Sequence, residues 1–266
     1  MDDAETELTH HVDPYLELLG VDTVGRLHDL ELLAELQRGH LVTVPFENLD
    51  VYQRRSVRTD VSWSLPKITQ QGRGGWCYEL NGAFGWLLRQ LGFEVDYVSC
   101  SVGGDDGWGP DLDHCALLVH LDDARWFVDV GFGDCCMIPI PLVPGEHPGI
   151  PRDVRCSISG DEFTLGERNL DGGWDDQLRG NTAPLTLADF TPRSDQLRTE
   201  PGLSWTEKPF ATRATDTNGS RVTLRPGVLR VREGTGAFSD RPIATDQWDH
   251  LLHTHFHIHG QPLAAV

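Results

Sequence analysis

The spacing of apolar residues predicts that the first third of the chain is mainly helical. After Trp76, leucine and aromatic side chains recur at every third or fourth position as far as Gly92, which marks one apolar face of a helix. The same spacing appears upstream of this segment. It predicts a short helix or turn at residues 15–19, and helices at residues 23–38 with an end at Gly39 and at residues 60–71.

The segment around Pro45 has a different pattern. Valine, phenylalanine, glutamate and asparagine follow one another at residues 44–48 without helical spacing. Proline lacks a backbone donor, which excludes a continuous helix and a central strand. We therefore expect an ordered loop that presents Phe46 and Glu47.

Downstream of Gly92 the pattern changes to short runs of β-branched and aromatic residues separated by turn residues. Residues 115–121 and 125–130 flank Asp122-Asp123 and are typical of a β-hairpin. This pattern indicates a small antiparallel sheet or barrel in the middle third. The other predicted strands cover residues 95–102, 154–158, 162–165, 174–178, 205–213, 221–224 and 228–232, and the last predicted helix covers residues 245–256.

The composition is that of a folded protein with a strongly acidic surface. Hydrophobic residues make up 39% of the 266 positions, and 41 acidic residues against 22 basic ones give a net charge of −19. Only Lys67 and Lys208 are lysines. The surface is therefore either that of a salt-adapted protein or that of an ordinary acidic enzyme. We expect no nucleic-acid partner, because duplex binding depends on patches of lysine and arginine.

No membrane or secretion signal is apparent. Residues 1–11 are polar and acidic, without a basic region followed by an apolar run. The cysteines lack the paired C-x-x-C spacing of zinc sites. We expect a cytoplasmic protein with no membrane partner and with reduced thiols. The six cysteines are Cys77, Cys100, Cys115, Cys135, Cys136 and Cys156.

Cys77 is the first candidate for chemistry. It follows two glycines and lies in the first turn of the helix predicted after Trp76. The unpaired N–H groups and the positive end of the helix dipole favour a thiolate there. The alternative is an ordinary buried cysteine, since free cysteine is among the most buried residue types.

A cysteine nucleophile needs a base and a group that orients this base. His114 lies eight residues before Asp122 and Asp129 lies six residues after Asp123, so the predicted hairpin brings both to the same end of its ribbon. Asp129 lies among apolar residues, and a buried carboxylate needs a partner such as an imidazole. Without Cys77, a strand-end histidine and a turn aspartate would be the simpler explanation.

The histidine cluster near the end of the chain offers a possible metal site. His255, His257 and His259 alternate, and would share one face of a strand. No cysteine or carboxylate nearby completes a set of ligands, and such a cluster is more often a solvated surface. We expect no metal.

Four short motifs resemble those of the arylamine N-acetyltransferases. They are VPFENLD at residues 44–50, RGGWCYELNG at residues 73–82, His114 before an apolar strand, and VDVGFG at residues 128–133. Four motifs in the family's order are far more specific than any single one. Weaker similarity continues from Tyr15 to Ile258.

The resemblance implies an α+β fold with a core similar to that of the cysteine proteases. An N-terminal helical bundle, residues 1–92, would carry the nucleophile. A central antiparallel β-barrel, residues 93–183, would carry the histidine and the aspartate of the site. A C-terminal α/β lid would follow at residues 184–266.

The resemblance also implies roles for individual residues. Cys77, His114 and Asp129 would form a catalytic triad, and Glu47 would pair with Arg73 to brace the cysteine loop. Residues less closely tied to the motifs complete the site. Phe46, Trp76 and Phe132 would form an aromatic wall for the acceptor or else belong to the plain core, and Gly131 and Gly133 would contact the coenzyme.

The implied reaction is the transfer of an acetyl group from acetyl-CoA to an arylamine or arylhydrazine. The acetyl group would pass through a thioester on Cys77, so the kinetics would be ping-pong. Two other enzymes would share the triad. One is an amide synthase of the same fold that closes a macrolactam, and the other is a cysteine hydrolase or transglutaminase-like enzyme. A binding module without catalysis is disfavoured, since all three triad residue types are present.

Overall fold

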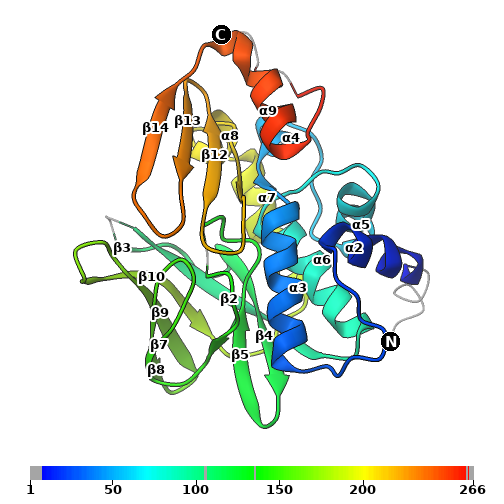
Figure 1. Cartoon of the computed structure of the whole chain (residues 1–266), viewed down its shortest axis with the longest axis vertical. Coiled ribbons are helices and arrows are strands. Elements are labelled where there is room, and N and C mark those ends of the chain that lie inside the picture. The colour runs from blue at the N-terminus through cyan, green and yellow to red at the C-terminus, as the bar shows by residue number, and fades with distance from the viewer. Residues whose placement is uncertain (1–7, 105–106, 135, 262, 264–266) are drawn as a thin grey trace.

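The computed structural model describes residues 8–104, 107–134, 136–261 and 263. Helices, a curled sheet and a second, smaller sheet follow one another along the chain (Figure 1). Cys135 lies outside the described residues, and the other cysteines are free thiols. No helix in the described ranges is long and apolar enough to cross a bilayer.

The helices of the first region surround α6, Cys77–Gln90. Residues 77–88 of α6 are all buried, so this helix contacts neighbours on every side. Its observed position confirms the helix predicted after Trp76. The helix predicted at residues 60–71 is also present, and residues 15–19 belong to a helix rather than a turn. The other helical segments are η1 Thr9–His11, α2 Val12–Leu19, α3 Leu30–Thr43, α4 Leu49–Tyr52 and α5 Val61–Thr69.

The helix predicted at residues 23–38 is wrong at its start. The Asp29 side chain accepts a hydrogen bond of 2.9 Å from the Leu32 N–H and caps α3, which therefore begins at Leu30. Val24 and Leu27, which had suggested an apolar face, are 87% and 78% exposed. The apolar spacing at these two positions is therefore coincidental.

The predicted end of that helix at Gly39 is also wrong, because α3 continues to Thr43. A Cβ atom at Gly39 would lie 2.8 Å from the Leu19 carbonyl oxygen. The glycine thus serves the close packing of α3 against the end of α2 rather than the end of a helix.

The larger sheet is antiparallel and curls into a nearly closed barrel, with strand order β6-β5-β4-β2-β10-β9-β8-β7 and β3 paired to β2. The central strands are buried on both faces. Tyr97 and Leu117 pack against the helices, and Val98 and Leu118 fill the barrel. The predicted hairpin and the other strands of the middle third are confirmed. The strands are β2 Glu94–Gly104, β3 Gly107–Trp108, β4 His114–Leu121, β5 Ala124–Val128, β6 Ile140–Pro141, β7 Gly145–His147, β8 Val154–Ser159, β9 Glu162–Arg168 and β10 Trp174–Asn181.

The smaller sheet forms the lid and has the order β1-β11-β12-β13-β14. Its apolar face packs against α9, with Leu224, Trp248 and Leu252 in a shared core. The predicted strands at residues 221–224 and 228–232 and the final helix are confirmed. The lid elements are η2 Leu187–Phe190, α7 Thr191–Thr199, α8 Ser204–Glu207, β11 Ala211–Ala214, β12 Arg221–Arg225, β13 Val228–Arg232, β14 Phe238–Pro242, η3 Thr245–Gln247 and α9 Trp248–Phe256.

Two segments near the lid differ from the sequence prediction. The expected loop after Pro45 contains the short strand β1, Phe46–Glu47, which pairs with β11 at the edge of the lid sheet. The strand predicted at residues 205–213 is instead α8 followed by β11. Both errors concern residues whose neighbours come from a distant part of the chain, and local patterns do not contain this information.

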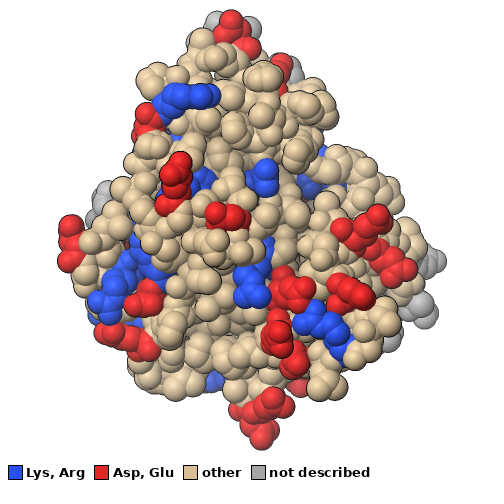
Figure 2. Space-filling view, in the orientation of Figure 1, with Lys and Arg blue, Asp and Glu red and all other residues tan. Residues whose placement is uncertain are grey.

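Acidic side chains are unevenly distributed over the face shown in Figure 2. They gather over the N-terminal helices and at the turn between β4 and β5, where Asp122 and Asp123 are exposed. Basic side chains on this face lie mainly beside acidic ones.

A buried histidine makes the stability of this fold sensitive to acid. His40 on α3 is fully buried between Tyr15 and Phe84, and neither ring nitrogen has a hydrogen-bond partner among the described residues. Burial lowers the pKa of His40 to about 3. In the unfolded chain the His40 imidazole binds a proton near pH 6.5, whereas in the folded chain it stays neutral down to about pH 3. The free energy of unfolding therefore falls as the pH drops from 6.5 towards 3.

We predict that His40→Leu removes this part of the acid sensitivity. Its free energy of unfolding, relative to the wild type, should rise by about 2 kcal/mol between pH 6.5 and pH 5. Urea unfolding at both pH values measures the change. His250→Leu, at an exposed position, is the control and should show no such rise. A His40→Leu difference that stays constant with pH would contradict the prediction.

Candidate active site

The start of α6 places Cys77 where the helical region meets the barrel. Cys77 is the first residue of the helix, with Trp76 as its N-cap, and it is 7% exposed. A Cβ atom at Gly131 would lie 2.7 Å from the Cys77 Cα. The chain just after β5 therefore passes directly over the cysteine, and only glycine fits there.

His114 and Asp129 lie side by side at the end of the hairpin. His114 begins β4, Asp129 follows β5, and the distance from His114 Nε2 to Asp129 Oδ2 is 2.7 Å. Both side chains are buried. The Cys77 side chain lies close enough to the His114 ring to contribute to its raised pKa. The structure therefore brings the three predicted triad residues together in the order cysteine, histidine, carboxylate.

These contacts favour a charged imidazole. Burial alone would lower the pKa of His114, but the charge of Asp129 and the hydrogen bonds to Asp129 and Cys77 raise it to about 10. His114 is then an imidazolium at neutral pH. A cationic imidazole beside a cysteine is the setting in which sulfur reacts as a thiolate.

Asn81 joins α6 to the hairpin, a role that the sequence analysis missed. Its side-chain N–H groups donate to Asp129 Oδ1 at 2.8 Å and to the Cys115 carbonyl at 2.7 Å. Its oxygen accepts from the Val130 N–H at 2.9 Å. Asn81 lies one helical turn after Cys77, so one helix face presents both the thiol and the amide that holds Asp129. The spacing C-x-E-x-N in the motif was the available signal.

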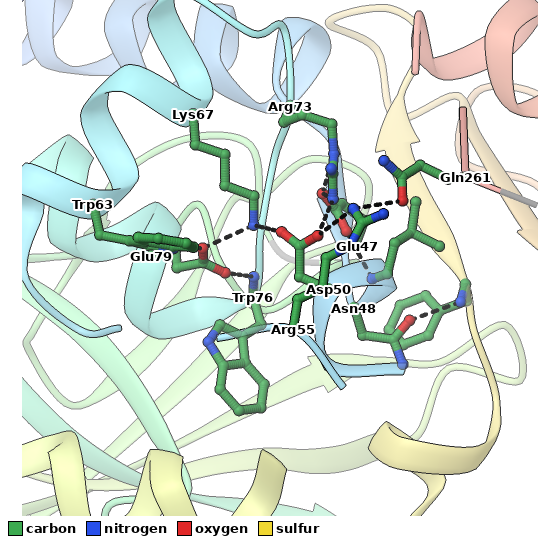
Figure 3. Close-up of polar contacts among 12 residues, drawn as sticks. Glu47, Asn48, Asp50, Arg55, Trp63, Lys67, Arg73, Trp76, Glu79 and Gln261 are labelled. Carbon is green, nitrogen blue, oxygen red and sulfur yellow. Dashed lines mark hydrogen bonds and ion pairs between the residues drawn. The ribbon is translucent and has the colours of Figure 1, made fainter. Parts of the chain in front are cut away.

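A buried ion cluster lies behind the cysteine loop (Figure 3). Arg73 donates to Glu47 Oε1 from Nε and Nη2 at 2.9 and 2.7 Å, and lies 3.3 Å from Asp50. Lys67 Nζ lies 2.8 Å from both Asp50 Oδ2 and Glu79 Oε1. The predicted pair of Glu47 and Arg73 is thus part of a larger set. We call Glu47, Asp50, Lys67, Arg73 and Glu79 the buried ion cluster.

The buried ion cluster reaches the backbone at the cysteine. Glu79 Oε2 accepts a hydrogen bond of 3.2 Å from the Trp76 N–H, and Glu47 Oε2 accepts one of 2.8 Å from the Leu49 N–H. The first contact is the glutamate half of a capping box at the start of α6. The buried ion cluster therefore connects the segment at residues 44–50 to the segment at residues 73–82, which contains Cys77.

The three residues predicted to form an aromatic wall lie in two separate places. Phe132 packs edge-on against the His114 ring at 5.4 Å between centroids. Phe46 and Trp76 lie on the lid side, where both contact Trp205, with centroid separations of 6.0 and 6.2 Å. Trp76 is only 1% exposed, so its ring lies beneath the surface of the site.

Gly131 and Gly133 adjoin the site without identifying a coenzyme contact. The Gly131 N–H donates to Asp129 Oδ1 at 2.8 Å and is therefore already engaged. Gly133 faces Thr212 and Phe46 of the lid sheet. Their coenzyme role stays a prediction. Within the described ranges, no group of three histidine, cysteine or carboxylate side chains is placed to hold a metal ion.

The charge of Asp129 can be tested by its effect on His114. We predict that Asp129→Asn lowers the pKa of His114 well below its wild-type value of about 10, because burial remains while the neighbouring charge of Asp129 is lost. In the wild type, the protonated ring adds stability that is complete below pH 6.5 and is lost as the pH rises towards 10. In Asp129→Asn, the free energy of unfolding should not show this decrease between pH 6.5 and pH 10.

The measurement is an NMR titration of the His114 ring. Asp96→Asn is the matched control, because Asp96 pairs with the half-exposed His120 at 2.8 Å on the same sheet. It should leave the His114 titration unchanged. A His114 ring that still titrates near pH 10 in Asp129→Asn would contradict the assignment.

Comparison with known proteins places this geometry in a family. A family model described as N-acetyltransferase matches residues 29–263. The chain is 33% identical over 225 residues to the arylamine N-acetyltransferase of Mycolicibacterium smegmatis, an alignment that covers 82% of this chain and 80% of that protein. It is 31% identical over 192 residues to the proansamycin X synthase of Amycolatopsis mediterranei (strain S699), covering 70% and 74%.

The fold agrees with solved structures of the same kind. The arylamine N-acetyltransferase of Mycobacterium marinum, solved in complex with CoA, superposes with a TM-score of 0.84 over 93% of this chain and 92% of that one. At 24% identity this likeness shows the fold alone. The family model and the curated relative carry the assignment further. The chain belongs to the arylamine N-acetyltransferase family of acyltransferases.

Proposed function

We propose that the protein transfers an acetyl group from acetyl-CoA to an arylamine or arylhydrazine through an acetyl-cysteine at Cys77. The observation that carries this proposal is the buried contact of Cys77, His114 and Asp129 at the start of α6. Nucleophile, base and orienting carboxylate are what acyl transfer through a thioester requires. Family membership supports the same reaction class.

In the first half-reaction the Cys77 thiolate attacks the thioester carbonyl of acetyl-CoA. The tetrahedral intermediate collapses when the bond to the coenzyme sulfur breaks, and the His114 imidazolium gives its proton to this leaving group. One thioester replaces another, so little free energy changes. The backbone N–H of Cys77, at the first position of α6, is suited to stabilise the oxyanion, because the N–H groups that begin a helix have no intrahelical acceptor.

In the second half-reaction the amine nitrogen attacks the acetyl-cysteine carbonyl. His114 is now neutral and removes a proton from the nitrogen as the bond to the Cys77 sulfur breaks. This restores the thiolate and the imidazolium. An arylamine suits the step, because its nitrogen is largely neutral at pH 7 and its ring matches the aromatic side chains beside His114 and Phe46.

A groove in the lid is suited to the anionic part of the donor. It has a volume of about 600 Å³, and its described lining includes the cations Lys208 and Arg225 but no acidic side chain. Trp205 lines it as well and contacts Trp76, the neighbour of Cys77. Phosphate groups favour such cations, and the fold relative from M. marinum holds CoA.

The amide synthase remains the second candidate. Proansamycin X synthase aligns over 74% of its length at 31% identity, which is the observation that favours it. In that reaction the amine and the acyl chain belong to one molecule. A protein that accepts acetyl-CoA poorly but cyclises a long acyl thioester would favour this alternative over acetyl transfer.

Substitution of the nucleophile tests the proposed function. Cys77→Ser should lower acetyl transfer at least about a thousandfold, because the serine hydroxyl is a far weaker nucleophile beside His114. Double-reciprocal plots of the wild-type initial rate against one substrate, at several fixed concentrations of the other, should give parallel lines, as a ping-pong mechanism requires. Cys136→Ser, at a partly exposed cysteine, should keep its activity. Undiminished transfer by Cys77→Ser would rule out the covalent route.

The lid groove makes a separate prediction about the donor. Lys208→Gln and Arg225→Gln should each raise the KM for acetyl-CoA roughly tenfold while kcat changes little, since each loses one charged contact to phosphate. Arg155→Gln removes an exposed arginine from the barrel and is the control for net charge. If Lys208→Gln and Arg225→Gln have the same KM for acetyl-CoA as the control Arg155→Gln, the coenzyme binds elsewhere.

A further inference from the structure

Lys67 has an environment that none of the roles described so far explains. It is one of two lysines in the chain and is only 5% exposed. From α5 its ammonium group reaches between two carboxylates, 2.8 Å from Glu79 and 2.8 Å from Asp50 (Figure 3). A buried ammonium loses its hydration, so its retention here requires those partners.

Glu79 depends on this contact more than the other carboxylates of the buried ion cluster do. It is 2% exposed, and Lys67 is the one cation that forms an ion pair with it among the described residues. Arg73 pairs instead with Glu47 and Asp50. The Trp63 indole N–H adds a neutral hydrogen bond of 3.0 Å to Glu79.

The charges that act on Glu79 come from three neighbouring elements. Glu47 on β1 and Asp50 on α4 are negative and oppose its ionisation, while Lys67 on α5 favours it. Burial raises the pKa of Glu79 further, and the Lys67 charge and hydrogen bond counteract this rise. The pKa of Glu79 stays above its usual value even with Lys67 in place, with burial as the largest cause, and loss of Lys67 would raise it further.

The ionised form of Glu79 is important because its carboxylate caps the start of α6. Its Oε2 accepts from the Trp76 N–H at the N-cap of α6, one residue before Cys77. A carboxylate accepts this bond more strongly than a carboxylic acid does, and its charge also favours the helix start. The protonation state of Glu79 is thus coupled to the position of the Cys77 backbone.

We propose that Lys67 is a positioning residue that keeps Glu79 ionised and thereby fixes the start of α6, with the Cys77 thiol in contact with His114. The inference rests on the proposed function only in taking Cys77 as the nucleophile. Lys67 touches neither substrate nor the reacting atoms, and it acts through the Glu79 carboxylate. Its loss should therefore appear as a new dependence of Cys77 reactivity on pH.

The sign of this dependence follows from the charges. In Lys67→Gln, Glu79 becomes protonated as the pH falls, the cap on the Trp76 N–H weakens, and Cys77 moves out of register with His114. At higher pH the carboxylate forms again and the cap returns. The reactivity of the variant relative to the wild type should therefore rise with pH.

The experiment measures alkylation of Cys77 by iodoacetamide in the full-length protein, with the site read by peptide mass mapping. The ratio of the Lys67→Gln rate to the wild-type rate should rise roughly tenfold between pH 6 and pH 9. Arg58→Gln removes an exposed arginine in the segment leading to α5 and should give a ratio that is flat with pH.

The double variant Lys67→Gln/Glu79→Gln separates positioning from general damage. A neutral glutamine at both sites removes the titrating carboxylate, so the ratio of the double-variant rate to the wild-type rate should be flat between pH 6 and pH 9, near the low value that Lys67→Gln reaches at pH 6. If Lys67→Gln alone fails to fold, the double variant, which has no buried carboxylate without a cation at position 79, should still fold, and its lowered and flat ratio becomes the test.

Two results would overturn the proposal. One is a Lys67→Gln ratio that does not change with pH, and the other is a double variant whose ratio still rises with pH although Glu79 is absent. Alkylation needs neither acetyl-CoA nor an acceptor. The proposed acetyl transfer could therefore fail while the positioning role holds, and the reverse outcome is equally visible.

Discussion

The contact of Asn81 with the hairpin is the interaction on which the arrangement of the site depends. Cys77 belongs to a helix, whereas His114 and Asp129 belong to strand ends about forty and fifty residues further along the chain. Asn81 binds Asp129 Oδ1, the Cys115 carbonyl and the Val130 N–H through a single buried amide. A buried polar group that is left without a hydrogen-bond partner costs about 1–3 kcal/mol. The helix and the barrel therefore approach one another in a single register.

The buried ion cluster makes a second constraint on the same helix, from the opposite side. Ion pairs removed from water add little net stability, because desolvation offsets the attraction. Their geometry is nevertheless well defined, since every charge must meet an opposite one. In this protein Lys67 joins Glu79 to Asp50, and Arg73 joins Asp50 to Glu47. Because these pairs are buried, dissolved salt screens them much less than it screens the acidic surface.

Local patterns predicted those parts of the structure whose information is local. The helix of Cys77 and the β4–β5 hairpin followed from spacing, and the hairpin alone placed His114 beside Asp129. The predicted start of α3 was wrong, because Val24 and Leu27 have the spacing of an apolar face but are exposed. Strand β1 was not predicted, because its pairing partner β11 lies far along the chain. Lys67, Asp50 and Asn81 were missed as site residues, because contacts across 12 to 49 positions define their roles. Such contacts depend on tertiary packing that spacing does not encode.

The central claim is that Cys77 carries the acetyl group between the two substrates. Intact mass measurement after incubation with acetyl-CoA alone, followed by peptide mapping, tests it most directly. The account predicts one added acetyl group, located on Cys77, which disappears when an arylamine or hydrazine is added and appears on the amine. An unmodified protein that still acetylates the amine, or an acetyl group located on another residue, would contradict it.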